Sequence, residues 1–499
     1  MTAASASAPR LDRILAGLRD RRIHVLGPSG TEGSAVIDFL TTHGITTIVA
    51  HDLEPPDRFE ATVERTHRWL DAQGRAALLA RLRAAPITWR HGPRYLDGVD
   101  DADVIFVPQS WHRHPQNAPV REAAARGVRL SSMTQLFFEL SPGPILGVTG
   151  TNGKFTVATL IASMLAAARL PVVISGNDRT HVPALYALDQ LSPETWLVLE
   201  ISNRQLVGLP YSPHVAVVTN IAPHHLDDHG SFEAYVEAKR TIVRHQTAHD
   251  VAVLNADDPA VAGMAQGLAS AVHWFSRRGP VTRGAYLVDD EIRLAGTPQP
   301  VLRLGDLVVP GAHMVENALA ATAAAGAVGV GGSVIASILR AFRGLPYRFR
   351  QVGERDGIAF FEDSLGTNPT AAGAAISSMT RPFHLIAGGL RRSARAADFE
   401  PMTRALAAAP VRGVYLIGST AAILADALVA GGVRTHMVQA GTLDRAMAEA
   451  WEAAAPGEAV LLSPGCESFD QFADYRQRGD RFTALMTALP ARAHKRAPV

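Results

Sequence analysis

Short apolar runs alternate with helical stretches along almost the whole chain. The first series begins with IHVLG (23–27), passes through a glycine-rich turn into a helical stretch that ends at Gly44, and reaches a second apolar run, ITTIVAHD, that ends at Asp52. A strand, helix, strand order of this kind is typical of a parallel, doubly wound sheet. The pattern therefore predicts an α/β fold, with ligands bound where the strands end.

Two more series of the same kind follow and indicate a chain of several domains. LSPGPILG (140–147) precedes the second series, and GLPYRFRQVGERDG precedes the third, which opens with IAFFEDS. Late in the second series, residues 285–311 are expected to form antiparallel strands, and residues 318–332 a packed helix with its C-terminal turn. Since 499 residues exceed the size of one ordinary hydrophobic core, we predict three domains, 1–143, 144–346 and 347–499.

The composition narrows the classes of partner. A formal net charge of +1 argues against a protein that coats nucleic acid or an anionic membrane. The single cysteine, Cys466, excludes an intrachain disulfide framework and a multi-cysteine zinc site, and it suits a reducing compartment. Residues 1–22 do not read as a signal peptide, and the most apolar stretch is too short to span a membrane. We expect a cytoplasmic monomer that neither binds nucleic acid nor inserts into a membrane.

The stretch GVTGTNGKFTVATLI (147–161) has the form of an apolar strand, a glycine-rich turn and a helix. Glycines let backbone N–H groups approach phosphate oxygens, the helix N-terminus adds its dipole, and Lys154 adds a positive charge. The next position usually carries a Ser or Thr that holds Mg²⁺, but here it is Phe155, whose ring cannot ligate a metal. Thr156 follows, rotated by about 100° around the helix. A nucleotide site is favoured over an ordinary turn, with its metal held by other ligands.

Carboxylates and histidines that could supply those ligands follow two later strands. Glu200 ends the strand VLEIS, and the loop NIAPHHLDDHGS carries His224, His225, Asp227, Asp228 and His229. A zinc site needs a closed set of three or four ligands, and adjacent histidines would point apart. One histidine that assists a Mg²⁺ or phosphate site is the better interpretation. Lys239, on the next helix, would by itself be read as a solvated lysine.

At this point the residues resemble a known family. The blocks that carry the likeness are GVTGTNGK, LEISNRQL, TNIAPHHLDDHGSFEAYVEAKRTI, VLNADD, GAHMVENALAA, GLPYRFRQV, EDSLGTNPTAA and LLSPGCESFDQFADYRQRGDRF. In this order they resemble the Mur ligases, which attach amino acids to the growing peptidoglycan precursor, and most of all the members that join glutamate to UDP-N-acetylmuramoyl-L-alanine. The resemblance implies an N-terminal Rossmann-like UDP-binding domain, a central P-loop ATPase domain with a mostly parallel sheet, and a C-terminal Rossmann-like domain.

The resemblance also implies a reaction. ATP would phosphorylate the acceptor carboxylate, and the amine of the incoming amino acid would then displace phosphate from the acyl phosphate. Such a site needs charge neutralisation more than a protein nucleophile. The implied cofactors are ATP and Mg²⁺, and the implied partners are a UDP-activated muramoyl substrate and an amino acid, with glutamate as the best match.

The resemblance also implies roles for individual residues, according to their positions in the matching blocks. Lys154 would hold the γ-phosphate, Glu200 and His225 would ligate Mg²⁺, and Lys239 matches a lysine that many members carbamylate into a further metal ligand. With Lys154, the nucleotide contacts would be Gly150, Thr151, Asn152, Gly153, Thr156, Asn317, Arg348 and Asp363, and Arg348 would bind the ATP phosphates. The muramoyl-peptide arm would contact Asn177 and Ser202. The incoming amino acid would contact Thr367, Arg392, Ser468 and Tyr475.

Several positions depart from the family pattern, and they lie mainly in the segments that are expected to carry the catalytic and binding residues. Besides Phe155, they are Met314 in place of an Asn, Leu365 in place of a Lys, Arg391 and Arg392 in place of an Asp-Lys pair, VPQSWHRHP (107–115, with Trp111) in place of a Ser-Pro-Gly turn, and Asn203 and Arg204 in place of Ser and an aromatic residue.

Two interpretations of these departures remain. One is an active ligase that adds glutamate to the muramoyl acceptor, or a related ligase that uses another acceptor or L-glutamate in a biosynthetic pathway. The other is a catalytically degenerate, nucleotide-binding homologue. The central lysines and acids are retained, whereas decay would scatter losses over all blocks. We therefore predict an active ATP-dependent ligase.

Overall fold

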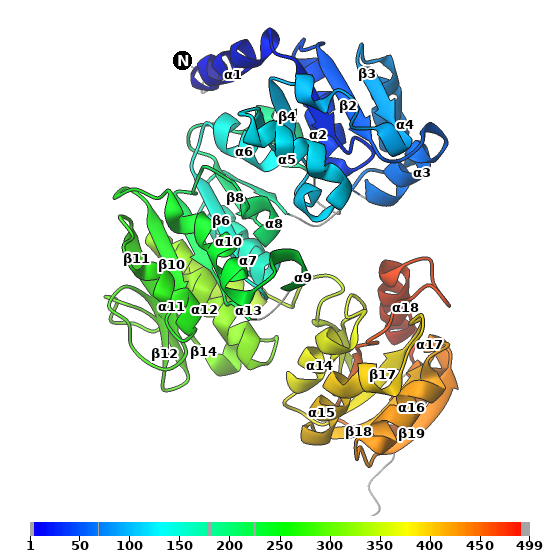
Figure 1. Ribbon diagram of the computed structural model, residues 1–499. Coiled ribbons are helices and arrows are strands. Elements are labelled where there is room, and N and C mark those ends of the chain that lie inside the picture. Colours follow the sequence, from blue (N-terminus) through cyan, green and yellow to red (C-terminus); the bar gives the residue numbers. More distant parts are fainter. Residues whose placement is uncertain (1–3, 68, 177–181, 223–225, 491–499) are drawn as a thin grey trace, which may run out of the picture. The chain divides into compact units, whose positions relative to one another are not determined.

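The computed structural model describes residues 4–67, 69–176, 182–222 and 226–490. These residues form three sheets, and the chain divides into two compact units. One unit runs up to Leu302 and includes Glu316–Ile338, and the other consists of Arg303–Val315 and the chain from Leu339 onward. The strands are mostly parallel and alternate with helices, so the predicted α/β class is confirmed (Figure 1).

The N-terminal sheet has the strand order β3-β2-β1-β4-β5, and each neighbouring pair is parallel. Every residue of β1 and β4 is buried, which is typical of a parallel sheet covered on both faces. The strands are β1 Ile23–Leu26, β2 Ile48–Asp52, β3 Thr88–His91, β4 Val104–Phe106 and β5 Arg129–Ser131. The helices are α1 Ala4–Arg19, α2 Thr31–Thr42, α3 Pro56–Thr66, α4 Ala72–Ala84, α5 Ala118–Ala125 and α6 Met133–Leu140.

The central sheet has the order β14-β13-β12-β11-β10-β9-β6-β8-β7. β12 and β13 pair antiparallel, as predicted for residues 285–311, while β12 through β7 pair parallel. The strands are β6 Ile145–Thr149, β7 Val172–Ser175, β8 Trp196–Glu200, β9 Val215–Val218, β10 Val251–Asn255, β11 Ala271–Ser276, β12 Gly284–Val288, β13 Glu291–Leu294 and β14 Leu302–Arg303. The helices are α7 Lys154–Ala167, α8 Asn203–Leu206, α9 Leu226–His229, α10 Phe232–Arg244, α11 Pro259–Ala262, α12 Ala312–Ala327 and α13 Gly332–Ala341.

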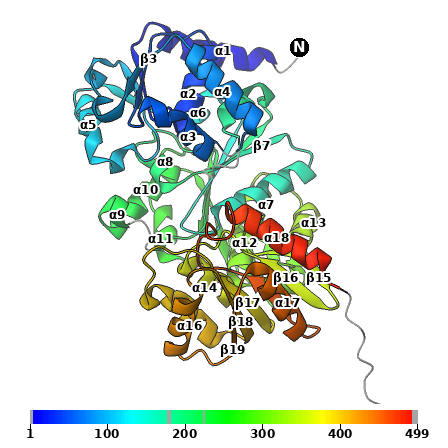
Figure 2. The ribbon, with the colours of Figure 1, turned by 90° about the vertical axis from the view of Figure 1, so that its right-hand side faces the viewer.

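The third sheet has the order β15-β16-β20-β17-β18-β19, in which only the edge pair β15 and β16 is antiparallel among the described strands. α14, α15 and α16 lie on one face of it, and α17 and α18 lie on the other (Figure 2). The strands are β15 Arg350–Arg355, β16 Ile358–Glu362, β17 Phe383–Gly388, β18 Val411–Ile417, β19 His436–Gly441 and β20 Ala459–Leu462. The helices are α14 Pro369–Ser377, α15 Glu400–Ala408, α16 Ala421–Ala430, α17 Leu443–Ala453 and α18 Tyr475–Ala488.

A buried arginine stabilises the loops that follow the third sheet's central strands. Arg478, in α18, is fully buried, and burial lowers its pKa to about 10. Its guanidinium donates to the Ser364 hydroxyl and carbonyl, both at 2.9 Å, and to the carbonyls of Cys466 and Glu467 at 3.1 and 3.3 Å. One side chain therefore ties the loop after β16 to the loop after β20.

Arg478→Met keeps the length of this side chain but removes its donors, and buried carbonyls then lack partners. We expect the unit to lose about 2–4 kcal/mol of its free energy of unfolding. Urea unfolding of the full chain, resolved by hydrogen exchange of the peptides that carry β16 and β20, measures this loss. Arg481→Met on the same helix is the control, because Arg481 forms a surface ion pair with Asp444 and should cost under about 1 kcal/mol. Equal losses of unfolding free energy in the two variants would contradict the role of Arg478 in joining the two loops.

Candidate functional site

The glycine-rich loop follows a fully buried strand, β6, and opens α7 as predicted. Lys154 and Thr156 lie in the first turn of α7, and the Lys154 ammonium donates to the carbonyl of Thr151 at 3.1 Å. The side chain is thus folded back over the loop that precedes it. The loop has the strand, turn and helix geometry that binds phosphates at a helix N-terminus.

Residues that follow β9 hold the loop in shape. The Asn220 carbonyl accepts from the Thr151 N–H at 2.8 Å, and the Asn220 side-chain oxygen accepts from the Asn152 N–H at 3.0 Å. The Thr219 hydroxyl donates to the carbonyl of Asn152 at 2.6 Å. Contacts with the residues that follow the neighbouring strand therefore preorganise the loop.

Packing, as well as backbone geometry, requires glycine in this loop. Gly150 and Gly153 have φ values of 150° and 80°, which favour glycine. A Cβ at Gly150 would overlap the Thr219 hydroxyl, and a Cβ at Gly153 would overlap the side-chain oxygen of Asn317 from α12. Asn317 is buried. The structure therefore brings this predicted nucleotide-contacting residue against the loop.

Phe155 lies beside the predicted metal ligand. A Cβ built on Gly176, just after β7, would lie 3.4 Å from Phe155 Cε2 and 3.7 Å from Glu200 Oε2. The ring and the carboxylate therefore approach the same point at the ends of β7 and β8. Phe155 supplies an apolar wall next to Glu200, where the usual residue would supply a hydroxyl.

Lys239 is buried, which excludes the solvated alternative. It is 1% exposed, donates to the carbonyl of Gly150 at 2.8 Å and lies 4.8 Å from the centre of the Tyr235 ring. Burial, and then the nearby charge of Lys154, hold the Lys239 pKa well below its ordinary value, while Glu200 opposes the shift. The structure thus gathers Lys154, Glu200 and Lys239 around the loop, and it favours a neutral amine at Lys239.

Ser202 connects this site to the N-terminal part of the same unit. It caps α8, where it accepts from the Gln205 N–H at 3.2 Å, and its hydroxyl donates to Gln109 Oε1 at 2.8 Å. The Gln109 N–H in turn donates to Glu32 at 2.7 Å. Burial raises the pKa of Glu32 to about 7. A polar chain therefore runs from the predicted acceptor-contacting Ser202 to the first turn of α2.

Two segments that depart from the family pattern meet at one carboxylate. Asp228 has a side chain that is 1% exposed, and it pairs with both Arg113 and Arg204. Nε of Arg204 lies 2.9 Å from the carboxylate. His229 is 2.7 Å from the side-chain nitrogen of Asn203. The unusual residues 107–115 and 203–204 thus belong to one polar cluster.

In the other unit, Asp363 is buried after β16. Its carboxylate accepts from the Phe349 N–H at 3.1 Å and from the Ser463 hydroxyl at 2.7 Å. Burial raises its pKa to about 7, and the charge of the exposed Arg348 is among the interactions that oppose the rise. The structure therefore brings Arg348 and Asp363 together, with a carboxyl group that changes charge near neutral pH.

The residues predicted to bind the amino acid lie at one edge of the third sheet, where β16, β20 and β17 end side by side. Hydrogen bonds of 2.8 Å from Gly465 N–H to the Gly366 carbonyl and from Leu390 N–H to the Glu467 carbonyl join their loops. The residues themselves are Thr367 after β16, Arg392 after β17, Ser468 after β20, and Tyr475 at the start of α18.

Arg391 and Arg392 differ in their surroundings. Arg391 pairs with Asp398 at 3.4 Å. Arg392 is exposed and forms no ion pair with any residue that the structure describes. Arg392 is therefore the arginine of the pair that is available to bind a carboxylate from solution.

Two predicted site residues, Asn177 and His225, lie outside the described residues. Within the described part of the chain, no three His, Cys, Asp or Glu side chains gather closely enough to hold a metal ion. Glu200 is a suitable hard oxygen donor for Mg²⁺, and a carbamate on Lys239 would add another.

The chain matches the Mur ligase middle domain over residues 148–325 and the Mur ligase glutamate ligase domain over residues 347–466. It is 39% identical over 420 residues to the UDP-N-acetylmuramoylalanine–D-glutamate ligase of Symbiobacterium thermophilum, with 83% of this chain and 90% of that protein covered. The chain belongs to the Mur ligase family. The enzyme of the same name from Pelotomaculum thermopropionicum is 34% identical over 472 residues, with 94% of this chain and 98% of that protein covered.

A solved structure confirms the Mur ligase fold. The UDP-N-acetylmuramate–alanine ligase of Thermotoga maritima has a TM-score of 0.53 and 18% identity, with 94% of this chain and 99% of that chain covered. None of the described helices combines the length and the apolarity that crossing a membrane requires.

Sequence reasoning missed the residues that position the loop. Thr219 and Asn220 were visible as a polar pair at the end of a strand, and Tyr235 as an aromatic residue one turn before Lys239. The Tyr235 hydroxyl lies 3.1 Å from that of Thr151. Gln109 carried no local signal, because its role depends on a contact with Ser202, 93 positions later.

Gly153→Ala should destabilise the protein more than Gly208→Ala. Both positions have φ near +75° to +80°, so both substitutions carry a backbone cost of about 1–2 kcal/mol, but a Cβ at Gly208 meets no atom within 4 Å. The overlap with Asn317 should add about 1–3 kcal/mol at Gly153. Urea unfolding measures both variants, and combining Gly153→Ala with Asn317→Ala should recover part of the added loss. Equal costs at the two glycines would show that Asn317 does not confine the loop.

Proposed function

We propose that this Mur ligase uses ATP to join glutamate to UDP-N-acetylmuramoyl-L-alanine, with Mg²⁺ as the metal. The observation that carries the proposal is the preorganised loop 150–153, with Lys154, Glu200 and Lys239 around it. The names of the relatives support D-glutamate as the amino acid and the muramoyl-alanine nucleotide as the acceptor.

The loop and Lys154 would bind and orient the ATP phosphates. Backbone N–H groups and the α7 N-terminus would stabilise the negative charge of the phosphates. The Lys154 ammonium would stabilise the charge that develops on the transferred phosphoryl group. Glu200, His225 and a carbamylated Lys239 would hold Mg²⁺, which when bound neutralises phosphate charge. We further propose that the remaining predicted positions keep the roles given above: Thr156, Asn317, Arg348 and Asp363 toward ATP, Asn177 and Ser202 toward the acceptor, and Thr367, Arg392, Ser468 and Tyr475 toward the amino acid.

Lys239 is suited to carbamylation. The reaction needs the neutral amine, whose nitrogen adds to the carbon of CO₂ and releases one proton, giving an N-carboxylate. Burial and the neighbouring Lys154 both favour the neutral form. The product would replace a potential second cation with an anion beside Lys154, which removes the repulsion between the two lysines.

A second candidate function is a ligase for a different acceptor, and the polar contacts near Ser202 favour it. The Gln109 and Ser202 contact and the pairing of Arg113 and Arg204 with Asp228 lie on the side of the unit where the acceptor residues are predicted. A polar cluster there, in place of a small turn, would select an acceptor of another shape or charge. An L-glutamate-specific ligase remains within the same reaction class.

Phosphate release from ATP tests the function. We expect release that requires Mg²⁺, UDP-N-acetylmuramoyl-L-alanine and glutamate together, with D- and L-glutamate and other amino acids compared. Lys154→Ala should lower kcat by about a hundredfold or more, because it removes a charge that stabilises the transferred phosphoryl group. Phe155→Ser should retain activity or strengthen Mg²⁺ binding. Full phosphate release by Lys154→Ala would refute the site. ATP binding without release under any pairing would favour the degenerate homologue.

Carbamylation of Lys239 can be observed without turnover. In ¹³C-bicarbonate buffer, the purified protein should give a carbamate carbon resonance by ¹³C NMR that is lost in Lys239→Arg. Raising the pH should increase the signal, since deprotonation of the amine promotes addition of CO₂. Lys154→Ala is the informative companion, because it should weaken the resonance without abolishing it, since burial still favours the neutral amine, while activity is lost. A resonance that survives Lys239→Arg would assign the carbamate elsewhere.

A further inference from the structure

The acceptor side of the site contains a hydrogen bond whose role the reaction does not explain. Ser202, which is expected to meet the muramoyl-peptide arm, is only 7% exposed. Its hydroxyl donates to Gln109 Oε1 at 2.8 Å and accepts from the Gln205 N–H at 3.2 Å. A hydroxyl has one hydrogen to donate. Because Gln109 receives that hydrogen, Ser202 has no donor left for an acceptor molecule.

Gln109 is more exposed than the serine to which it is bonded. It is partly exposed, whereas Ser202 is buried. The carboxamide of a glutamine can both donate and accept, and the oxygen that binds Ser202 can accept a second hydrogen bond. Of the two hydrogen-bonded residues, Gln109 is therefore the one that a molecule from solution can reach more readily.

The loop that carries Gln109 is held at several points. The Gln109 N–H donates to Glu32, in the first turn of α2, at 2.7 Å. Further along, the Asn117 side chain donates to the Trp111 carbonyl at 2.7 Å, and Arg113 belongs to the buried ion-pair cluster described above. A side chain that selects a ligand must be held in a defined position. These contacts supply that condition for Gln109.

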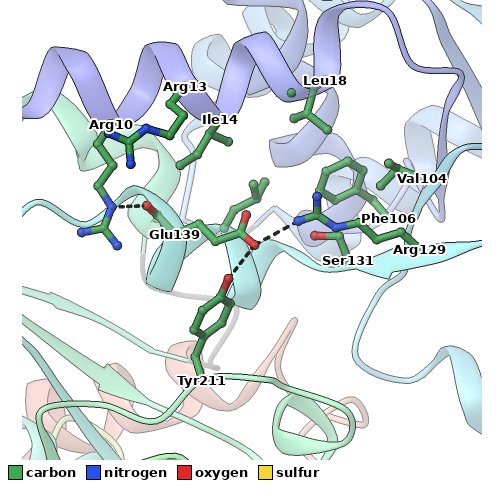
Figure 3. A pocket seen from close by; sticks show the side chains of 12 residues that line it. Arg10, Arg13, Ile14, Leu18, Val104, Phe106, Arg129, Ser131, Glu139 and Tyr211 are labelled. Carbon is green, nitrogen blue, oxygen red and sulfur yellow. Dashed lines mark hydrogen bonds and ion pairs between the residues drawn. The ribbon is translucent and has the colours of Figure 1, made fainter.

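The N-terminal and central parts of the unit, which carry Gln109 and Ser202, pack against each other. One hydrophobic core contains buried residues of both parts. At another point where the two parts meet, Glu139 of α6 accepts from the Tyr211 hydroxyl and pairs with Arg129, both at 3.1 Å (Figure 3). Packing and polar contacts elsewhere therefore help to set the separation of Gln109 and Ser202.

The chemistry of Gln109 favours a neutral partner. A carboxamide pairs most fully with another amide, because each group then donates one hydrogen bond and accepts one. A carboxylate or a phosphate would find no positive charge in this side chain, and the Glu32 carboxyl is bonded to the N–H of the same residue. The muramoyl-alanine arm contains a neutral amide, which joins its muramoyl and alanyl parts.

We propose that Gln109 is a specificity-determining residue for the acceptor, and that its carboxamide binds the amide of the muramoyl-alanine arm. Ser202 is then a positioning residue, since its hydroxyl holds the Gln109 oxygen in place. The assignment rests on the proposed function, because it concerns the acceptor named there. It gives the recognition of the arm to a residue of segment 107–115, which departs from the family pattern.

Calorimetric titration of the full chain with UDP-N-acetylmuramoyl-L-alanine, without ATP or glutamate, measures this contact. Gln109→Met keeps the length of the side chain and removes its hydrogen bonds, so we expect binding to weaken about tenfold. Gln116→Met is the matched control, because Gln116 is an exposed glutamine of the same loop, and it should bind like the parent protein. Equal affinity of Gln109→Met and the parent protein would overturn the proposal and leave the proposed function standing. No binding by the parent protein would refute the proposed acceptor, and the role of Gln109 with it.

An acceptor analogue with L-lactate in place of L-alanine identifies the group that is recognised. It has an ester oxygen where the arm has its amide N–H, so the Gln109 oxygen has no hydrogen to accept from it. The parent protein should bind the amide about tenfold more tightly than the ester, and Gln109→Met should bind the two about equally. Equal affinity of the parent protein for amide and ester would refute the assignment of the amide.

Ser202→Ala separates positioning from direct contact. If Ser202 acts through Gln109, the double variant should bind the acceptor no more weakly than Gln109→Met alone. Losses that multiply would show that Ser202 contacts the acceptor by itself, contrary to the proposal. In steady-state assays, the effect of Gln109→Met should appear in the KM for the acceptor and not in the KM for ATP. An equal rise in both KM values, as a general disturbance of the unit would cause, would also contradict it.

Discussion

The loop 150–153 has no room for a side chain at either glycine, and the surrounding elements depend on that constraint. Thr219 lies against Gly150 and Asn317 lies against Gly153, so the end of β9 and the helix α12 both approach the loop at backbone distance. Lys239 can then reach the carbonyl of Gly150 from α10, which buries its amine. A larger residue in the loop would separate these elements and return water to Lys239. The close approach of the loop backbone thus accompanies the burial that lowers the pKa of Lys239.

The apolar ring of Phe155 affects the surroundings of the Glu200 carboxylate. Its ring and the Glu200 carboxylate approach one point beside Gly176, and both residues are partly exposed. An apolar neighbour lowers the polarity on its side of a carboxylate, and lower polarity strengthens the attraction of a carboxylate for a cation. A hydroxyl at this position would offer a direct ligand, whereas the ring increases the effect of the ligand that remains. The substitution therefore changes how charge is held at the site without removing the site.

The sequence predicted the central strands and missed several edge strands, for a physical reason. Strands such as β6 and β16 are buried on both faces and read as apolar runs. β3, β7 and β15 lie at the edges of their sheets and are mostly half-buried or exposed. β3 and β15 are rich in polar and charged residues, whereas β7 is a short apolar run, VVIS. β11 is an exception, because it lies inside its sheet but is only half-buried over most of its length. In the site, Lys154 and Glu200 were predictable from strand ends, whereas the partners of Ser202 and Asp228 depend on contacts between distant segments.

The cluster at Asp228 bears on whether the unusual residues reflect decay or adaptation. Arg113 and Arg204 come from segments far apart in the chain, and both pair with one buried carboxylate. Replacing either arginine alone would leave that carboxylate less compensated, which is costly in a buried position. Both departures thus contact the same carboxylate, and each of them helps to compensate its buried charge. The Asp228 cluster therefore gives the departures at 107–115 and 203–204 a structural role, which agrees better with a folded, working ligase than with losses scattered by decay.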